Sequence, residues 1–295
     1  MKTLISKPGI YSGIPIEHYL GQPCVGPSVN SSGLRAIWRS PAYYWCFSPL
    51  NPERLPPEEK EHFVLGKATH WCILGEDAFS TKFIVRPARF DSWRTTESKK
   101  WRSDQEAVGR TVLLPSQIEV IRGMAKSLAR SPLVKAGILN GEIEQSIFWK
   151  DEETSIWCGS RPDCIPNDSG DVCDLKTSTS VEYDDISRTI GTLGYHMQAA
   201  LVGEGFKQVL KRPMTSFSLC FSEKTPPFCS RIVTLKDCDL DRGAKQNRAS
   251  LRIMADCLEK NWWPGPGDYS DADFVEIPAW LQTRIDKELE FKGVK

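Results

Sequence analysis

The sequence lacks the features that mark several common classes of protein. Its 38 basic and 38 acidic residues cancel, so it has no excess of positive charge of the kind that coats nucleic acid nonspecifically. No apolar run approaches the length of a membrane span, and the first eight residues lack the apolar core of a signal peptide. It also contains no internal repeat or low-complexity block. We therefore expect a cytoplasmic globular protein that makes no use of a membrane.

Cysteine is present ten times, yet no two cysteines are spaced as Cys-x-x-Cys, so the pattern of a zinc ribbon is absent. In the cytoplasm these thiols are expected to be reduced. Most of them are expected to act as small buried hydrophobic side chains.

Helical and strand patterns alternate along the chain, which predicts one α/β domain with a mixed central β-sheet flanked by helices and a helical N-terminal portion. Residues 1–27 are rich in glycine and proline and are expected to form an extended N-terminal arm. The domain is expected to span 28–265, and 266–295 to form a peripheral tail. A helix predicted at about 57–74 contains His70 near its C-terminal end.

The middle of the chain predicts three neighbouring strands separated by two turns rich in Asp, Asn, Ser and Gly. Glu144 opens the first strand, and Asp163 closes the second. The predicted strands are 144–149, 156–163 and 172–177.

The third predicted strand gives the most informative pattern. Because side chains alternate along a strand, Asp174 and Lys176 project to the same side. Leu175 points into apolar packing, and its carbonyl stays near the acidic side chains. Together with Asp163, eleven residues earlier, these groups predict a site for a hard divalent cation and a phosphodiester.

Further motifs accompany this pattern. They are Leu65-Gly66-Lys67-Ala68-Thr69-His70-Trp71-Cys72-Ile73-Leu74, Gly159-Ser160-Arg161-Pro162-Asp163, Asp174-Leu175-Lys176-Thr177 and Gly194-Tyr195-His196-Met197-Gln198-Ala199-Ala200. Their order, with Glu144, resembles the PD-(D/E)xK nuclease superfamily, and within it the nuclease domain of exodeoxyribonuclease VIII (RecE) and its phage relatives. The resemblance covers roughly 28–265 and implies a restriction-endonuclease-like core.

We assign Asp163 and Asp174 as metal ligands, with the Leu175 carbonyl completing one site. The resemblance implies that His70 is a further ligand or orients metal-bound water. Glu144 could hold a second ion through water, although Glu142 could take its place. Mg²⁺ is the expected cofactor, and Mn²⁺ is also expected to be accepted because imidazole is a rare ligand of magnesium.

Lys176 is expected to lose its proton more readily beside a cation, which would lower its pKa. It would then orient or deprotonate the attacking water, or act as an ammonium that stabilises the transition state. Tyr195 and Gln198 lie three residues apart and share a helix face. The resemblance directs Gln198 at the catalytic lysine or at the DNA backbone, whereas the alternative is a solvated glutamine beside a capping tyrosine.

Several arginines and aromatic residues are candidates for DNA contact. Arg161 shares a strand face with Asp163 and either contacts a phosphate or pairs with a nearby acid. The stretch from Arg86 to Arg102 interleaves basic and aromatic side chains, so that Arg94 could hold a phosphate while Trp93 stacks on a base. A solvated loop above buried tryptophans is the alternative. Arg35 and Arg39 could receive a 5′-terminal phosphate.

The expected function is a metal-dependent exonuclease that hydrolyses one strand of linear double-stranded DNA. The resemblance implies 5′-to-3′ digestion that leaves 3′ overhangs for recombination by strand annealing, in a phage or bacterial cell. It also implies a ring-like homo-oligomer, such as a tetramer, and a RecT-type annealing partner. One alternative is an iron–sulfur nuclease of the CRISPR-associated or helicase-linked kind, although its cysteines would be spaced more tightly. The other is a DNA-end-binding module without catalysis.

Overall fold

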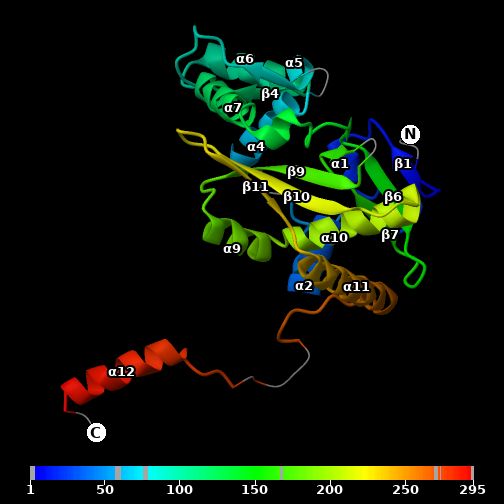
Figure 1. The fold of residues 1–295 in the computed structure, drawn as a ribbon, viewed down its shortest axis with the longest axis vertical. Coiled ribbons are helices and arrows are strands. Elements are labelled where there is room, and N and C mark those ends of the chain that lie inside the picture. Colours follow the sequence, from blue (N-terminus) through cyan, green and yellow to red (C-terminus); the bar gives the residue numbers. More distant parts are fainter. Residues whose placement is uncertain are drawn as a thin grey trace.

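The structure is a computed structural model that describes residues 4–56, 61–75, 79–166, 169–268, 272 and 274–293, apart from the side chains at 61–63. Its strands form two larger sheets and two short pairs (Figure 1). The first sheet has the order β1 (Gly9–Tyr11), β6 (Ser146–Lys150), β7 (Trp157–Ser160) and β2 (Ser28–Asn30). The second has the order β11 (Ser230–Thr234), β10 (Ser216–Glu223) and β9 (Asp171–Ser178). The short pairs are β3 (Phe83–Val85) with β4 (Thr111–Leu113), and β5 (Glu142–Ile143) with β8 (Cys164–Ile165).

Both larger sheets are mixed. In the first, β2 runs parallel to β7 while the other pairs are antiparallel. In the second, β9 and β10 are parallel and β10 and β11 are antiparallel. The predicted α/β class with mixed sheets and flanking helices is therefore confirmed.

The predicted set of three neighbouring strands was wrong in one respect, because β6 and β7 belong to one sheet and β9 to the other. The strand expected to reach Asp163 ends at Ser160. Pro162 has no N–H to donate to a strand ladder. The main chain of Asp163 also bonds elsewhere, since its N–H donates to Asp174 Oδ1 at 3.1 Å and its carbonyl accepts from Glu144 N at 3.1 Å.

The helix predicted at about 57–74 is α4, which ends at Ile73, and its predicted start at 57–60 lies outside the described residues. The longer helices are α2 (Ser31–Arg39), α3 (Pro41–Phe47), α4 (Glu61–Ile73), α6 (Thr96–Ala107), α7 (Pro115–Leu128), α9 (Tyr183–Leu193), α10 (Tyr195–Gly205), α11 (Asp237–Lys260) and α12 (Ala279–Phe291). The short ones are α1 (Ile16–Tyr19), α5 (Phe79–Lys82), α8 (Pro132–Lys135) and a π-helix (Phe206–Leu210).

Helices cover both faces of the second sheet. On one face Phe217 and Leu219 pack in the main core with residues of α2, α10 and α11. On the other face Leu175 packs with Leu74, which follows α4, and with Leu128 of α7. Burying an aliphatic side chain of this size stabilises a fold by about 1.5–3 kcal/mol. The alternation along β9 thus fixes which of its side chains face the core and which remain for a site.

Residues 79–135, which we call the upper lobe, contain α5–α8 with β3 and β4 and lie above the two larger sheets (Figure 1). The lobe packs on α4 through Ala68, which is fully buried among Phe83, Leu113 and Met124. Helix α4 therefore joins the upper lobe to the sheet that contains β9.

The N-terminal residues that were expected to form an extended arm pack against the first sheet. Strand β1 pairs with β6, and Tyr19 is buried beside Phe148 and Trp157. At the other end, α12 has no buried residue and lies away from the sheets (Figure 1). The domain boundaries at 28 and 265 stay predictions. None of the described helices is both long and apolar enough to span a membrane.

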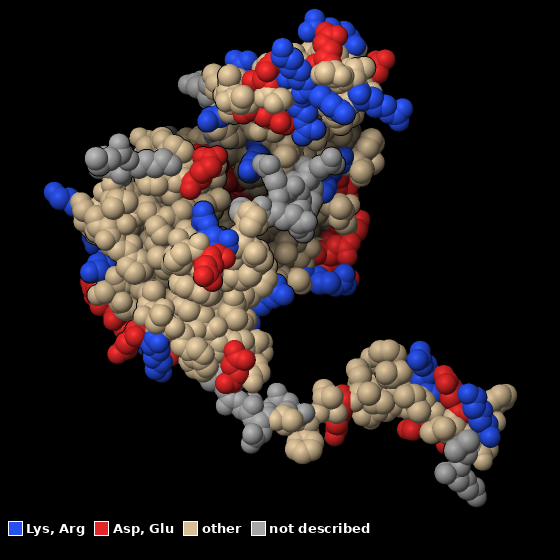
Figure 2. Space-filling model, turned by 180° about the vertical axis from the view of Figure 1, so that it is seen from behind, with Lys and Arg blue, Asp and Glu red and all other residues tan. Residues whose placement is uncertain are grey.

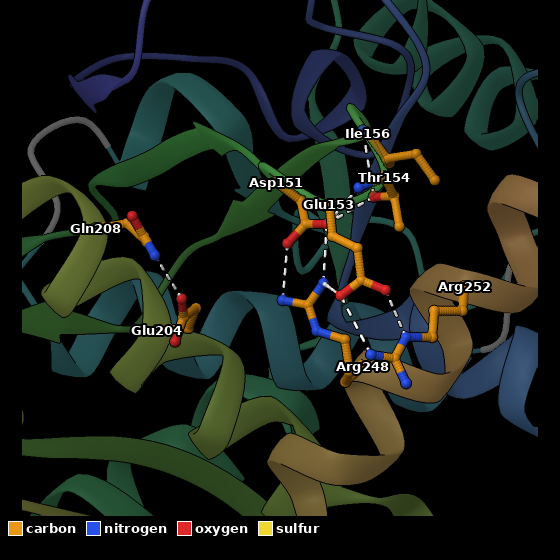
Figure 3. Close-up of polar contacts among 8 residues, drawn as sticks. All are labelled: Asp151, Glu153, Thr154, Ile156, Glu204, Gln208, Arg248 and Arg252. Carbon is orange, nitrogen blue, oxygen red and sulfur yellow. Dashed lines mark hydrogen bonds and ion pairs between the residues drawn. The ribbon is translucent and has the colours of Figure 1, made fainter.

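The hairpin between β6 and β7 is tied to α11 by ion pairs (Figure 3). Asp151 Oδ1 lies 2.8 Å from the Nη2 atom of Arg248, and Asp151 Oδ2 accepts from Thr154 N at 3.0 Å and Oγ1 at 2.7 Å. Burial raises the pKa of the Asp151 carboxyl, but Arg248 and Thr154 outweigh burial and hold that pKa below its ordinary value of 3.8. The more exposed Glu153 pairs with Arg248 and Arg252.

We expect Asp151→Ala to lower the free energy of unfolding by about 2 kcal/mol at pH 7, because the Thr154 donors lose their acceptor and Arg248 keeps only its pair with the exposed Glu153. A carboxyl whose pKa is depressed by folding stabilises the protein above its unfolded pKa, and this contribution is lost as the pH falls through the folded pKa. The difference from wild type in urea unfolding should therefore shrink below about pH 4. Glu153→Ala is the exposed control, expected to change stability much less because solvent screens its ion pairs. An Asp151→Ala deficit that is equal at pH 7 and pH 3 would contradict this account.

Candidate metal centre and active site

Strand β9 places an acid and a lysine side by side at the edge of the second sheet. Lys176 Nζ lies 3.0 Å from Asp174 Oδ2, so the predicted shared face of these residues is confirmed. Asp174 is fully buried, and the Lys176 side chain is 16 % exposed. Leu175 faces the opposite core, as expected.

Asp163 is locked against β9 by two reciprocal hydrogen bonds. Its N–H donates to Asp174 Oδ1, and its Oδ2 accepts from Leu175 N at 2.5 Å. Because the N–H and C=O of one strand residue point to the same edge, the Leu175 carbonyl also faces Asp163. The two carboxylates are thus held next to each other, and their sharing of a metal ion with the Leu175 carbonyl stays a prediction.

His70 and Glu144 complete the group from two other segments. His70, in the last turn of α4, has its Nδ1 atom 3.3 Å from Asp163 Oδ1. Glu144 has a positive φ of 51°, and its N–H donates to the Asp163 carbonyl, which turns its side chain toward the same place. Ligand atoms of His70, Glu144 and Asp163 all lie within 4.8 Å of one another. Glu142, the alternative to Glu144, is exposed on β5 and is not in this group.

This donor set fits a divalent cation. Carboxylate oxygens suit Mg²⁺ and Mn²⁺, and one imidazole favours the softer Mn²⁺ as an accepted ion. Asp174 lies beside the group rather than in it, because its oxygens accept hydrogen bonds from Asp163 N, Lys176 and Gln198. An ionised carboxylate offers about four acceptor positions, so Asp174 keeps capacity to coordinate an ion beside these three hydrogen bonds.

The charges of the site shift the pKa values of all four central groups. Burial raises the pKa of Asp174, and the charge of Asp163 raises it further. Burial also acts to raise the pKa of Asp163, but His70 and Lys176 outweigh burial and lower it. Burial lowers the pKa values of Lys176 and His70, yet the carboxylates outweigh burial and raise both. The expectation of a lowered Lys176 pKa depended on a nearby cation, and the protein's own carboxylates shift it the other way.

Helix α10 brings a third polar side chain to the site. It begins after Gly194, whose φ of 66° allows the sharp change of direction from α9. Gln198 then donates to Asp174 Oδ2, and the Tyr195 ring lies 5.1 Å from Lys176 Nζ. The expected partner of Gln198 was the lysine or DNA, whereas its contact is the carboxylate that the lysine also binds. Spacing placed it on the correct helix face but could not say which of two adjacent groups it meets.

Arg161 holds the site together instead of projecting toward a substrate. Its side chain is 7 % exposed, and its Nη1 atom lies 3.9 Å from Glu144 Oε2. It donates to Ser146 Oγ and to the Ile14 carbonyl at 2.7 Å, and it lies 4.5 Å over the Tyr19 ring. These contacts favour the predicted pairing with an acid over the predicted phosphate contact.

Sequence reasoning did not identify Tyr19 and Ser146 as parts of this site. The signal that could have found Ser146 is a hydroxyl at the start of an otherwise apolar strand. Tyr19 lies in the segment expected to be an arm, and its hydroxyl donates to the Gly159 carbonyl at 3.2 Å. No short-range pattern links residues that are 140 positions apart.

The other candidate DNA contacts lie outside this group. Arg35 donates to the Leu193 and Ser31 carbonyls, and burial lowers its pKa. Arg39 lies 3.9 Å over the Tyr43 ring. Arg94 is exposed and Trp93 half-buried in the upper lobe. Their roles in binding stay predictions.

A mixed α/β fold with two acids and a lysine gathered at a strand edge defines a PD-(D/E)xK-type domain. Residues 31–272 match the family described as a PDDEXK-like domain of unknown function (DUF3799), and the chain belongs to this family. The resemblance found in the sequence is thereby confirmed at the level of a nuclease-type domain.

The protein is also similar to solved structures. One is from Eubacterium rectale, provisionally named an exonuclease, with 13 % identity, a TM-score of 0.60, and 93 % of this chain and 98 % of that chain covered. At this identity the likeness shows the fold alone. Another is a phage-related exonuclease from Haemophilus somnus 129PT, with 11 % identity, a TM-score of 0.33, and 80 % and 96 % coverage. No curated protein matches the chain.

Proposed function

We propose that this protein is a divalent-metal-dependent DNA exonuclease that hydrolyses one strand of linear duplex DNA from the 5′ end and leaves 3′ overhangs. The observation that supports it is the convergence of Asp163, Asp174 and Lys176, with His70 and Glu144 beside them. The family match and the name of the Eubacterium rectale protein favour nuclease chemistry over other uses of such a site.

In this proposal Asp163, Glu144, His70 and the Leu175 carbonyl would hold Mg²⁺ or Mn²⁺, and Asp174 would be a further ligand. The ion supplies positive charge near the scissile phosphate and a water that is more easily deprotonated. Lys176, paired with Asp174, carries a charge that can stabilise negative oxygen in the transition state. Its contacts thus favour the ammonium role over the role of general base. Gln198 and Tyr195 keep the lysine and Asp174 in place.

Two further parts of the proposal rest on the resemblance found in the sequence. A ring-like homo-oligomer would enclose the duplex, and a RecT-type protein would take up the exposed strand for annealing. The iron–sulfur alternative has less support. Among the described residues, one cluster of His, Cys, Asp and Glu side chains is close enough to bind a metal ion together, and this cluster contains no cysteine. A binding module without catalysis would not need the Lys176–Asp174 pair.

The test is digestion of linear and covalently closed circular duplexes of the same sequence, with Mg²⁺, with Mn²⁺ and with chelator. We expect linear DNA to be degraded only with metal, and a 5′ label to be released before a 3′ label. Closed circles should survive, since they offer no end. Equal cutting of closed circles would instead identify an endonuclease, and early release of the 3′ label would reverse the polarity.

A further inference from the structure

Positive charge is concentrated in the upper lobe, although the chain as a whole is neutral. Residues 79–135 contain twelve basic and five acidic residues, a net charge of +7, so the remainder of the chain has a net charge of −7. Basic side chains gather over this lobe at the top of Figure 2. A charge separation of this size within one chain creates a local positive potential that attracts polyanions.

Within the lobe, the guanidinium groups of two arginines lie over the ring of one tryptophan. Arg86 and Arg102 each lie 5.4 Å from the centre of the Trp93 ring. That ring is parallel to Trp101, with centroids 6.3 Å apart and an interplanar angle of 10°. Trp93 is thus already in contact with three side chains, which disfavours the predicted stacking on a DNA base. Its role is to position the arginines.

One guanidinium in this cluster has unused hydrogen-bonding capacity. Arg86 Nε is buried and has no hydrogen-bond partner among the described residues. Because this atom is buried, a phosphate would have to bind Arg86 through its Nη atoms. Arg94, Lys99 and Lys100 are exposed nearby, on the loop before α6 and on α6 itself. The side chains together form an anion-binding surface.

The upper lobe adjoins the candidate metal centre through α4. Ala68 packs into the upper lobe, and His70, two residues later on α4, faces Asp163. Figure 2 shows a hollow between the lobe and the body of the molecule, with acidic side chains inside it. A chain of phosphates that enters this hollow would pass along the lobe.

We propose that the upper lobe binds the sugar–phosphate backbone of DNA and guides it to the metal centre, through Arg86, Arg94, Lys99, Lys100 and Arg102. This inference rests on the proposed function for its choice of polyanion. Contacts of this kind position the duplex without reading its sequence. They release counterions, so binding through them weakens as salt increases.

The experiment measures binding of a fluorescein-labelled blunt duplex of about 30 base pairs in EDTA, by anisotropy, at several salt concentrations. The test variant combines Arg94→Ala, Lys99→Ala and Lys100→Ala, whose side chains are exposed. We expect affinity to fall at least about tenfold at low salt, and the slope of log K against log salt to lose about 2.7, or about 0.9 for each phosphate contact. The matched control combines Lys207→Ala, Lys211→Ala and Lys245→Ala, which remove the same charge from an exposed region outside the lobe. The control should keep the wild-type slope.

The outcomes separate this inference from the proposed function, because binding in EDTA requires no cleavage. A wild-type protein that binds the duplex with the expected slope but never degrades DNA would reject the nuclease and leave the binding surface supported. An unchanged slope in the test variant, or an equal loss in the control, would overturn the surface. A wild-type protein that fails to bind the duplex would overturn it as well.

Discussion

Replacing Lys176 with methionine will lower the rate of DNA cleavage by about a thousandfold or more. Methionine keeps most of the aliphatic bulk and removes the charge that lies 3.0 Å from Asp174. Loss of one preorganised electrostatic contact at a reacting phosphate or carbonyl costs about 10²–10³ in rate. Here the lysine also holds Asp174 in position, which increases the expected effect.

The same substitution will destabilise the protein in EDTA by about 3 kcal/mol. Asp163 and Asp174 are both buried, and Lys176 is the positive group that balances Asp174. Removing one partner of a buried ion pair leaves an uncompensated charge, which costs about 3–5 kcal/mol. His70 continues to offset Asp163, so the lower end of this range applies.

Both effects of Lys176→Met are measurable on one preparation, by release of labelled nucleotides with Mg²⁺ and by urea unfolding in EDTA. Lys245→Met is the matched control, because Lys245 is exposed on α11 and should tolerate the change. Wild-type cleavage by the Lys176 variant would remove this residue from the mechanism. If the Lys176 variant is inactive but as stable as wild type, another positive group must balance the charges of Asp163 and Asp174.

The sequence was sufficient to predict the part of the site that depends on local geometry. Alternation along β9 placed Asp174 and Lys176 on one face and Leu175 on the other, and the helical period placed Tyr195 with Gln198. The contacts of Arg161 could not be predicted this way. Its partners are Ile14, 147 residues earlier, and Ser146 in the neighbouring strand. Such pairings depend on how separate segments pack, and side-chain spacing contains no information about that.

The strand that was expected to continue through Asp163 shows the same limit. Apolar and β-branched residues predicted the strand correctly up to Ser160. Beyond it, the N–H of Asp163 donates to Asp174 and its carbonyl accepts from Glu144 N. These partners are in place only after β9 and the segment that follows β5 have packed. Tertiary contacts at the site thus overrode a local preference.

Two acids buried close together lower the stability of the protein when no metal ion is bound. The mutual repulsion of Asp163 and Asp174 raises the pKa of Asp174, in addition to the effect of burial. Residues selected for metal binding are therefore expected to reduce stability when the metal is removed. This leads to a prediction that contrasts with the one for Lys176.

Asp163→Asn will abolish metal-dependent cleavage and will destabilise the protein in EDTA much less than Lys176→Met. Asparagine can keep both hydrogen bonds, since its carbonyl oxygen can accept from Leu175 N and its amide can donate to Nδ1 of a neutral His70. Neutralising Asp163 relieves its repulsion of Asp174 but also removes its attraction to His70 and Lys176, which holds its own pKa low. The two effects oppose each other, so the free energy of unfolding in EDTA should fall by less than about 1 kcal/mol. Metal affinity should fall at least about a hundredfold. Substituting a residue that only supports a metal ligand typically lowers affinity about 10–100-fold, and here a ligand itself is lost.

Calorimetric titration with Mn²⁺ measures the affinity, and urea unfolding with and without Mn²⁺ measures the coupling to stability. Wild type should gain stability with added Mn²⁺, whereas Asp163→Asn should remove that gain. Asp171→Asn is the matched control on the same strand, because Asp171 is exposed and accepts a hydrogen bond from Ser216 that an amide oxygen can also accept. Wild-type Mn²⁺ affinity in the Asp163 variant would place the metal elsewhere. A loss of stability in EDTA comparable to that of Lys176→Met would show that the fold needs the negative charge of Asp163. Asparagine at this position can keep the hydrogen bonds and lacks only the charge.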